Sequence, residues 1–179
     1  MTSIRTVSLF LAAGAATLAL SAGSAPAQVM RDHNAGAPVD FSAGQIEIQD
    51  RADRVVLSGG VSVTQAGLSI RSARMTIAYT NADGIDINRI DATGGVTITK
   101  GSERATGDVA VYDLDRRLIT LVGNVALIQG SNRLNGGRVV IDLASGRSTI
   151  DGRSSGGGSV GQASGGRVTG TFTVPQRKR

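Results

Sequence analysis

Apolar and polar residues alternate with a period of two along most of the chain after residue 41. The segment "ITLVGNVALIQGSNRLNGGRVVIDL", residues 119–143, is typical: aliphatic residues occupy alternate positions, a Gly-Ser turn interrupts them, and the alternation resumes. Successive side chains of a β-strand point to opposite faces of the sheet, so this period predicts strands with one apolar face and one polar face. No segment shows helical spacing of comparable quality. The pattern predicts an all-β protein built from antiparallel strands.

Three segments repeat one short motif, "SGGVSV", "TGGVTI" and "VGNVAL", at residues 58–63, 93–98 and 122–127. Successive copies are offset by 35 and by 29 residues. Each unit consists of a strand, a turn, a second strand and a polar turn. Such a unit cannot bury its apolar face alone, so neighbouring units must stack around a shared interior. The glycine before each valine predicts a bulge where a long strand passes from one sheet to another, and hence an antiparallel jelly-roll of two folded-over sheets.

The aliphatic positions that share a parity define a predicted inward face. Its members are Ile46, Ile48, Val55, Leu57, Val61, Val63, Ile70, Met75, Ile77, Val96, Ile98, Val109, Val111, Ile119, Leu121, Val125, Leu127, Val139 and Ile141. These residues either pack only against one another, as in any β-sandwich, or line a groove. The alternation by itself fits both interpretations.

The N-terminal segment precedes the region of alternation. Residues 1–27 are predicted to be a secretory signal peptide, because Arg5 is followed by an apolar run too short for a bilayer span and by small residues at 25–27 that suit cleavage. An uncleaved membrane anchor is the alternative interpretation. Residues 28–38 show no period and are predicted to form a flexible arm, which carries His33, the only histidine.

The domain of alternating strands is expected to span residues 39–151. Residues 152–166 are a Gly/Ser-rich linker, residues 167–175 regain the alternation of one last strand, and residues 176–179 form a basic tail. The tail is expected to be solvated, with a docking site for anions as the alternative.

Composition excludes several classes of function. The chain has no cysteine, which removes disulfides, thiolate nucleophiles and zinc-thiolate sites. After removal of Arg5 with the signal peptide, 18 basic residues remain against 14 acidic ones, a net charge of +4. Aromatic residues are too few for base stacking, so nucleic acid is not an expected partner.

We predict that the chain is not an enzyme and that it uses no cofactor or metal. Asp113 and Asp115 are a pair of carboxylates in a predicted turn, where exposure keeps them ordinary acids. The single histidine, His33, lies outside the predicted domain, so no serine, histidine and aspartate set forms a triad. No glycine-rich loop for nucleotide phosphates occurs.

The chain resembles the OstA-like, LptA family of periplasmic bridge proteins for lipopolysaccharide export. The resemblance lies in the absence of cysteine, the cleavable signal, and the order of the segments "VVLSGGVSVTQ", "ARMTIAY", "IDATGGVTI", "ATGDVAVYD", "ITLVGNVALIQG" and "RVTGTFTVP". The likeness covers roughly residues 41–151 and extends to the last strand. The Gly/Ser insertion before that strand is longer than the family leads us to expect.

The resemblance implies a V-shaped β-jelly-roll with open ends, located in the periplasm. It also implies that the inward residues shelter the lipid A acyl chains of lipopolysaccharide, and that domains associate head to tail. The implied partners are an inner-membrane-anchored LptC-like protein, an outer-membrane LptD-like translocon and further copies of the chain.

We expect the edge strands for this association near Ile46 and Ile48 at one end, and near residues 139–143 or 168–174 at the other. Two alternatives remain open from the sequence. One is a structural or interaction module of the envelope or cell surface without lipid cargo. The other is a lipid or polysaccharide hydrolase, for which the residues supply no chemistry.

Overall fold

The computed structural model describes residues 30, 33–81, 84–152 and 166–173. The predicted signal peptide and basic tail, and most of the Gly/Ser linker, lie outside these residues. Ten antiparallel strands and one short 3-10 helix make up the described part. Their bounds are β1 Asp40–Ser42, β2 Gln45–Gln49, η1 Asp50–Ala52, β3 Arg54–Gln65, β4 Leu68–Thr80, β5 Asp86–Lys100, β6 Glu103–Asp113, β7 Leu118–Gln129, β8 Asn132–Asp142, β9 Arg147–Asp151 and β10 Thr169–Thr171.

The strands form one continuous sheet in the order β1-β3-β4-β5-β6-β7-β8-β10, with β2 paired to β3 and β9 paired to β8. The two short strands at each end pair with different halves of one long strand: β2 lies along residues 54–58 of β3, and β1 lies along residues 62–64. In the same way β9 lies along residues 138–142 of β8, and β10 along residues 133–135. The sheet is therefore folded across the middle of its long strands.

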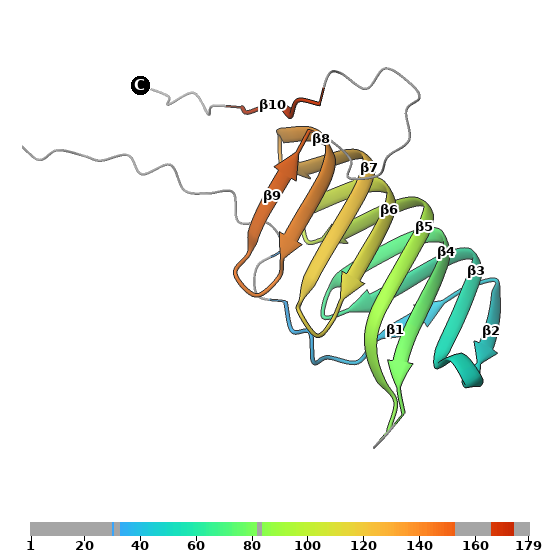
Figure 1. The fold of residues 1–179 in the computed structure, drawn as a ribbon. Helices are drawn as coiled ribbons and strands as arrows, with labels where there is room; N and C mark the ends of the chain where they lie inside the picture. Colours follow the sequence, from blue (N-terminus) through green and yellow to red (C-terminus); the bar gives the residue numbers. More distant parts are fainter. Residues whose placement is uncertain (1–29, 31–32, 82–83, 153–165, 174–179) are drawn as a thin grey trace, which may run out of the picture.

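This fold gives two layers, which Figure 1 shows as a stack of bent ribbons. The first layer contains β2, β9 and the halves of β3 to β8 between them, and the second contains β1, β10 and the other halves. The structure is thus the all-β, folded-over antiparallel jelly-roll that the alternation and the Gly-Val steps predict, and its sheet is unclosed, as the family resemblance implies. We call the space between the inward faces of the layers the trough.

Bulges at the fold line connect the layers. The register of each pair of long strands shifts there. In the pairs β3 with β4, β5 with β6 and β7 with β8, two residues of the odd-numbered strand face one residue of its neighbour. The two residues at each bulge are Gly59 and Gly60, Gly94 and Gly95, and Gly123 and Asn124, all with positive φ. The predicted role of the Gly-Val steps as bulges between two sheets is confirmed.

Close packing adds a second reason for glycine at one of these positions. A Cβ atom built on Gly94 would lie 2.7 Å from the Cβ of Ala73 on β4, in addition to the strain of a φ of +83°. A side chain at residue 94 would therefore push β4 and β5 apart where the sheet folds.

The core is the row of inward residues that runs through both layers. Its fully buried side chains include Leu57 and Met75 of the first layer and Ile98 of the second, each at 0 % exposure. Inward residues of β3, β5 and β7 keep odd or even numbering through the bulge, since two residues of each strand lie there. Inward residues of β4, β6 and β8 switch between odd and even numbering, since one residue of each lies there.

Candidate functional site

The trough is closed along its middle. Most of the predicted inward residues are buried between the layers: Leu57, Val61, Val63, Ile70, Met75, Ile77, Val96, Ile98, Ile119, Leu121, Val125, Leu127, Val139 and Ile141 are buried, and Val55 is half-buried. A narrow crevice between Val63, Leu68, Ile70, Ile90 and Tyr112 is too tight to admit a water molecule. In this state the middle of the trough is a packed core.

The two ends of the trough differ from its middle, because their inward-facing residues are exposed. Ile46 and Ile48 of β2 lie opposite Leu57 and Val55, so they share the inward face, yet they are 48 % and 65 % exposed. Phe41 of β1 lies opposite Val63 on the other layer and is 48 % exposed. At the β1/β2 end, both layers therefore present inward-facing apolar side chains to solvent.

The β9/β10 end shows the same feature in the second layer. Gly170 of β10 lies opposite Leu134, which in turn pairs with the buried Leu127. Val168 and Phe172 have the parity of Gly170 and are 41 % and 61 % exposed. The apolar row thus begins and ends in solvent while its middle is buried.

The prediction of an inward orientation is wrong for Val109 and Val111. Val109 is 39 % exposed and Val111 half-buried, because β6 changes parity at its bulge and places Ala110 and Tyr112 inside instead. Ala110 pairs with Leu121, and Tyr112 pairs with Ile119. The valines stand on the outer face of the sheet, where a β-branched side chain suits a strand without being buried.

The expectation for the edge near residues 139–143 also needs correction. This part of β8 is covered by β9, whose residues Ile150 and Ser148 pair with Val139 and Ile141. The edges of the sheet at that end are β9 in the first layer and β10 in the second. The strand at residues 147–151 was not expected, because its polar residues and its single aliphatic residue give little alternation.

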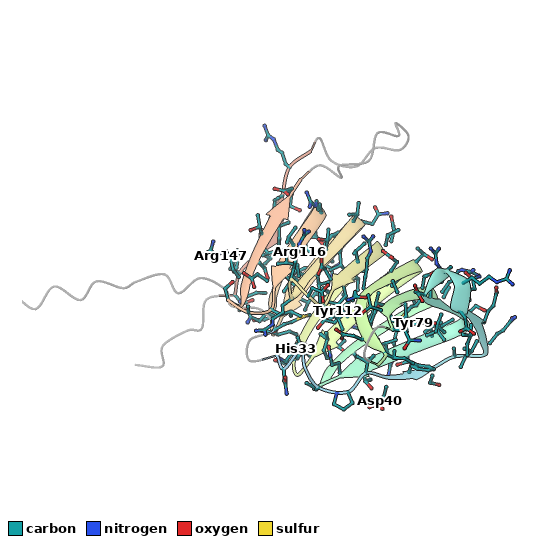
Figure 2. All side chains as sticks on the ribbon, turned by 60° about the horizontal axis from the view of Figure 1, so that its bottom comes forward. His33, Asp40, Tyr79, Tyr112, Arg116 and Arg147 are labelled. Carbon is teal, nitrogen blue, oxygen red and sulfur yellow. The ribbon has the colours of Figure 1, made fainter. Side chains whose placement is uncertain are left out.

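The arm is packed in its described part, contrary to the expectation that residues 28–38 are flexible. His33 is buried, and its Nε2 lies 3.1 Å from Oε1 of Gln65 and 3.0 Å from the hydroxyl oxygen of Tyr112. The Tyr112 hydroxyl donates to the same Gln65 oxygen at 2.8 Å. Figure 2 shows His33 beside Tyr112, where the arm passes the strands.

Burial sets the protonation of this cluster. Desolvation lowers the pKa of His33 below its usual 6.5; the hydrogen bond that the ring donates to Oε1 of Gln65 opposes the shift, and the charge of Lys100 adds to it. Desolvation raises the pKa of Tyr112 to about 12, so its hydroxyl keeps the proton that it donates to Gln65. Nδ1 of His33 is buried without a hydrogen-bond partner. A neutral imidazole is the form that fits this site.

Asp113 accepts a hydrogen bond from the backbone N–H of Arg116 and closes the turn after β6. No group of three or more histidine, aspartate or glutamate residues is arranged to hold a metal ion in the described part of the chain. Within the same residues, no helix is long and apolar enough to cross a membrane.

Comparison with known proteins fits this geometry. Residues 41–147 match the family model described as "LptA/(LptD N-terminal domain) LPS transport protein". The chain belongs to this family. The description is that of a transport protein.

A relative and a solved structure complete the comparison. An uncharacterized protein of Rhizobium meliloti (strain 1021) is 27 % identical over 90 residues, which are 47 % of this chain and 48 % of the relative, so the match spans about half the length of each. The crystal structure of LptH from Pseudomonas aeruginosa, an LptA-homologous periplasmic component of the lipopolysaccharide transport device, superposes with a TM-score of 0.69 at 17 % identity. The superposition covers 83 % of this chain and 100 % of LptH, and it supports the fold.

Proposed function

We propose that this protein carries lipopolysaccharide through the periplasm as part of a bridge between the two membranes, with the lipid A acyl chains held in the trough. The observation that carries the proposal is the exposure of inward apolar residues at both ends of a row that is otherwise buried. Family membership supports the same function.

The physical need for such a trough follows from the cost of hydrating acyl chains. Each methylene exposed to water costs about 0.8 kcal/mol, so a tail of about a dozen methylenes costs on the order of 10 kcal/mol. Aliphatic walls such as Leu121, Ile98 and Val139 replace the bilayer interior for such a tail. Because the middle is closed, the layers have to separate to admit it, and the bulges at the fold line are the place where they can bend apart.

Photo-crosslinking at paired positions on one strand tests this function. A photoreactive residue at Ile48, on the inward face of β2, is expected to label purified rough-type lipopolysaccharide, whereas one at the neighbouring outward Glu47 is not. Phe172 and Thr171 form the matched pair at the other end. Equal labelling within each pair, or none at all, would contradict the proposal and favour the structural module.

We further propose that copies of the chain, and LptC-like and LptD-like partners, join end to end by pairing of edge strands. The edges are β1 and β2 at one end and β9 and β10 at the other, and each described edge strand has a neighbour on one side only. An unpaired row of backbone N–H and C=O groups accepts a further strand. Head-to-tail pairing would align one trough with the next.

A lysine placed on an edge strand tests this association, because charge on an edge discourages strand addition. Thr149→Lys on β9 is expected to reduce concentration-dependent assembly, measured by sedimentation velocity. Thr64→Lys, at an exposed position of the interior strand β3, is the matched control and should leave assembly unchanged. Equal behaviour of the two variants would count against pairing at β9.

A further inference from the structure

The described part of the N-terminal arm crosses the side of the trough opposite the bulges. We call this side the mouth; it is lined by the turns that connect the strands. In Figure 1 the arm runs below the strands toward β1. Its contacts are with strand ends at the mouth: the backbone N–H of Met30 donates to the carboxylate of Glu103, and Nζ of Lys100 donates to the carbonyl oxygen of Met30 at 3.3 Å.

The cluster of His33, Gln65 and Tyr112 ties the arm to both layers. Gln65 ends β3 in the second layer, and Tyr112 lies near the end of β6 in the first. The side-chain amide of Gln65 also donates to the carbonyl oxygens of Ala35 and Ala37, at 2.8 and 2.9 Å. The arm therefore adds to the direct hydrogen bond from Tyr112 to Gln65 in holding the two layers together across the mouth.

Met30 places an apolar side chain in the interior. It is 1 % exposed and belongs to the same buried cluster as Leu68, Ile98 and Ile119. Its side chain is unbranched and flexible, and it fills irregular apolar gaps in the way a short alkyl chain would. The arm thus occupies apolar space that the proposed cargo would need.

The arm is attached more weakly than the strands it covers. Its described residues precede β1, which begins at Asp40, and they form no strand pairing. Most of their hydrogen bonds to the body of the protein run through the side chains of Gln65, Tyr112, Lys100 and Glu103. The buried Nδ1 of His33 has no partner, which further weakens this attachment. Segments with few ladder hydrogen bonds open more easily than the core strands.

We propose that residues 30 and 33–38 form a displaceable strap that closes the mouth of the empty trough, and that an entering acyl chain displaces Met30 from the interior. This inference rests on the proposed lipopolysaccharide-carrying function. The strap keeps the apolar walls dry and the layers closed without cargo. Its release leaves the direct hydrogen bond between Tyr112 and Gln65 as the remaining polar contact of this cluster between the two layers, and so makes their separation easier.

Thiol labelling tests the strap in the full mature chain, since the protein has no cysteine of its own. Met30→Cys is expected to react slowly with a water-soluble maleimide, and on the order of tenfold faster once purified rough-type lipopolysaccharide is bound. Val56→Cys, which is buried on the outer face of β3 and not in the trough, is the control and should stay protected in both states. Met30→Cys combined with His33→Ala should react faster than Met30→Cys alone even without lipid.

The outcomes separate this inference from the function on which it rests. If lipopolysaccharide co-elutes with Met30→Cys protein, as judged by mass spectrometry, and residue 30 stays protected, the strap is a fixed part of the fold and the inference is overturned while the function stands. If the wild-type protein binds no lipopolysaccharide, both are overturned. Should Met30→Cys fold poorly, hydrogen exchange of the Gly36 and Ala37 amides in the wild-type protein gives the same readout: exchange that lipopolysaccharide accelerates supports the strap, and unchanged exchange refutes it.

Discussion

The middle and the ends of the trough are built from the same row of residues and differ in what covers them. Leu121 in the middle has a strand on each side and the opposite layer above it, and it is fully buried. Ile48 at the β1/β2 end occupies an equivalent inward position on an edge strand, and about two thirds of its surface is exposed. Inward orientation is therefore a property of the strand, whereas burial is a property of the neighbours.

Because the middle of the trough is covered and its ends are not, the two regions contribute to different properties of the protein. The middle supplies the buried apolar area that holds the two layers together, while the ends contribute little to that area and leave apolar side chains available to a partner or a cargo. Substitutions in the two regions should consequently affect different measurements.

The largest expected effect is on stability in the middle. Leu121→Ala is expected to lower the free energy of unfolding by about 2–5 kcal/mol, because it removes buried methyl groups and leaves a cavity. Ile48→Ala, at the exposed end, should change it by about 0.5 kcal/mol or less. Urea denaturation followed by circular dichroism measures both. Equal losses in the two variants would show that the middle is not closed in solution.

A smaller effect is expected at the fold line of the middle strands. Gly94→Ala should cost about 1–3 kcal/mol, since a residue with positive φ is strained and the new methyl group would meet Ala73. Gly95→Ala, with a φ of +79° and nothing within 4 Å of the added Cβ, should cost only the backbone strain of about 1 kcal/mol. The difference between the two free energies isolates the close packing of β4 against β5. If Gly95→Ala were as costly as Gly94→Ala, packing at the bulge would have no measurable role.

The smallest expected effect concerns the arm at the mouth. Burial lowers the pKa of His33, so the unfolded chain binds more protons than the folded one as the pH falls below 6.5. The contribution of the neutral imidazole is complete above that pH and is lost as the pH falls through the lowered folded-state pKa. Lys100 and Glu103 also face this part of the arm, and Tyr112 stays protonated throughout.

Unfolding free energies between pH 5 and 8 test this dependence. The wild-type protein should become less stable as the pH falls through this range, and His33→Gln should lose the part of the slope that the only histidine causes. A wild-type slope that persists unchanged in His33→Gln would assign the pH dependence to the carboxylates instead.

The alternation and the repeat were sufficient to predict the class of fold and its bulges. Leu57, Val63 and Leu121 follow the period of two. The Gly-Val steps occur where two residues of an odd-numbered strand face one residue of the next strand. These features are local, so they can be read from neighbouring positions in the sequence.

Other features depend on contacts between distant residues and could not be predicted in this way. The placement of Ala110 and Tyr112 inside, and of Val109 outside, depends on a one-residue shift that pairs β6 with β5 and β7. The burial of Met30 and His33 depends on Glu103, Gln65 and Tyr112, which lie 32 to 79 residues further along the chain. The exposure of inward residues such as Ile48 also depends on which strands form the edges of the sheet, and the sequence pattern does not identify these strands.

The repeat unit between two successive bulges also suggests how the sheet of such a protein can gain or lose strands during evolution. Residues 94–122 contain one half of β5, all of β6 and one half of β7, and they contribute two neighbouring segments to each layer. Tandem duplication of this 29-residue module would extend the sheet by two strand spacings, roughly 10 Å, without altering either terminal strand. Evolution could therefore match the reach of a single domain to the gap it has to cross in discrete steps, by adding or deleting whole modules.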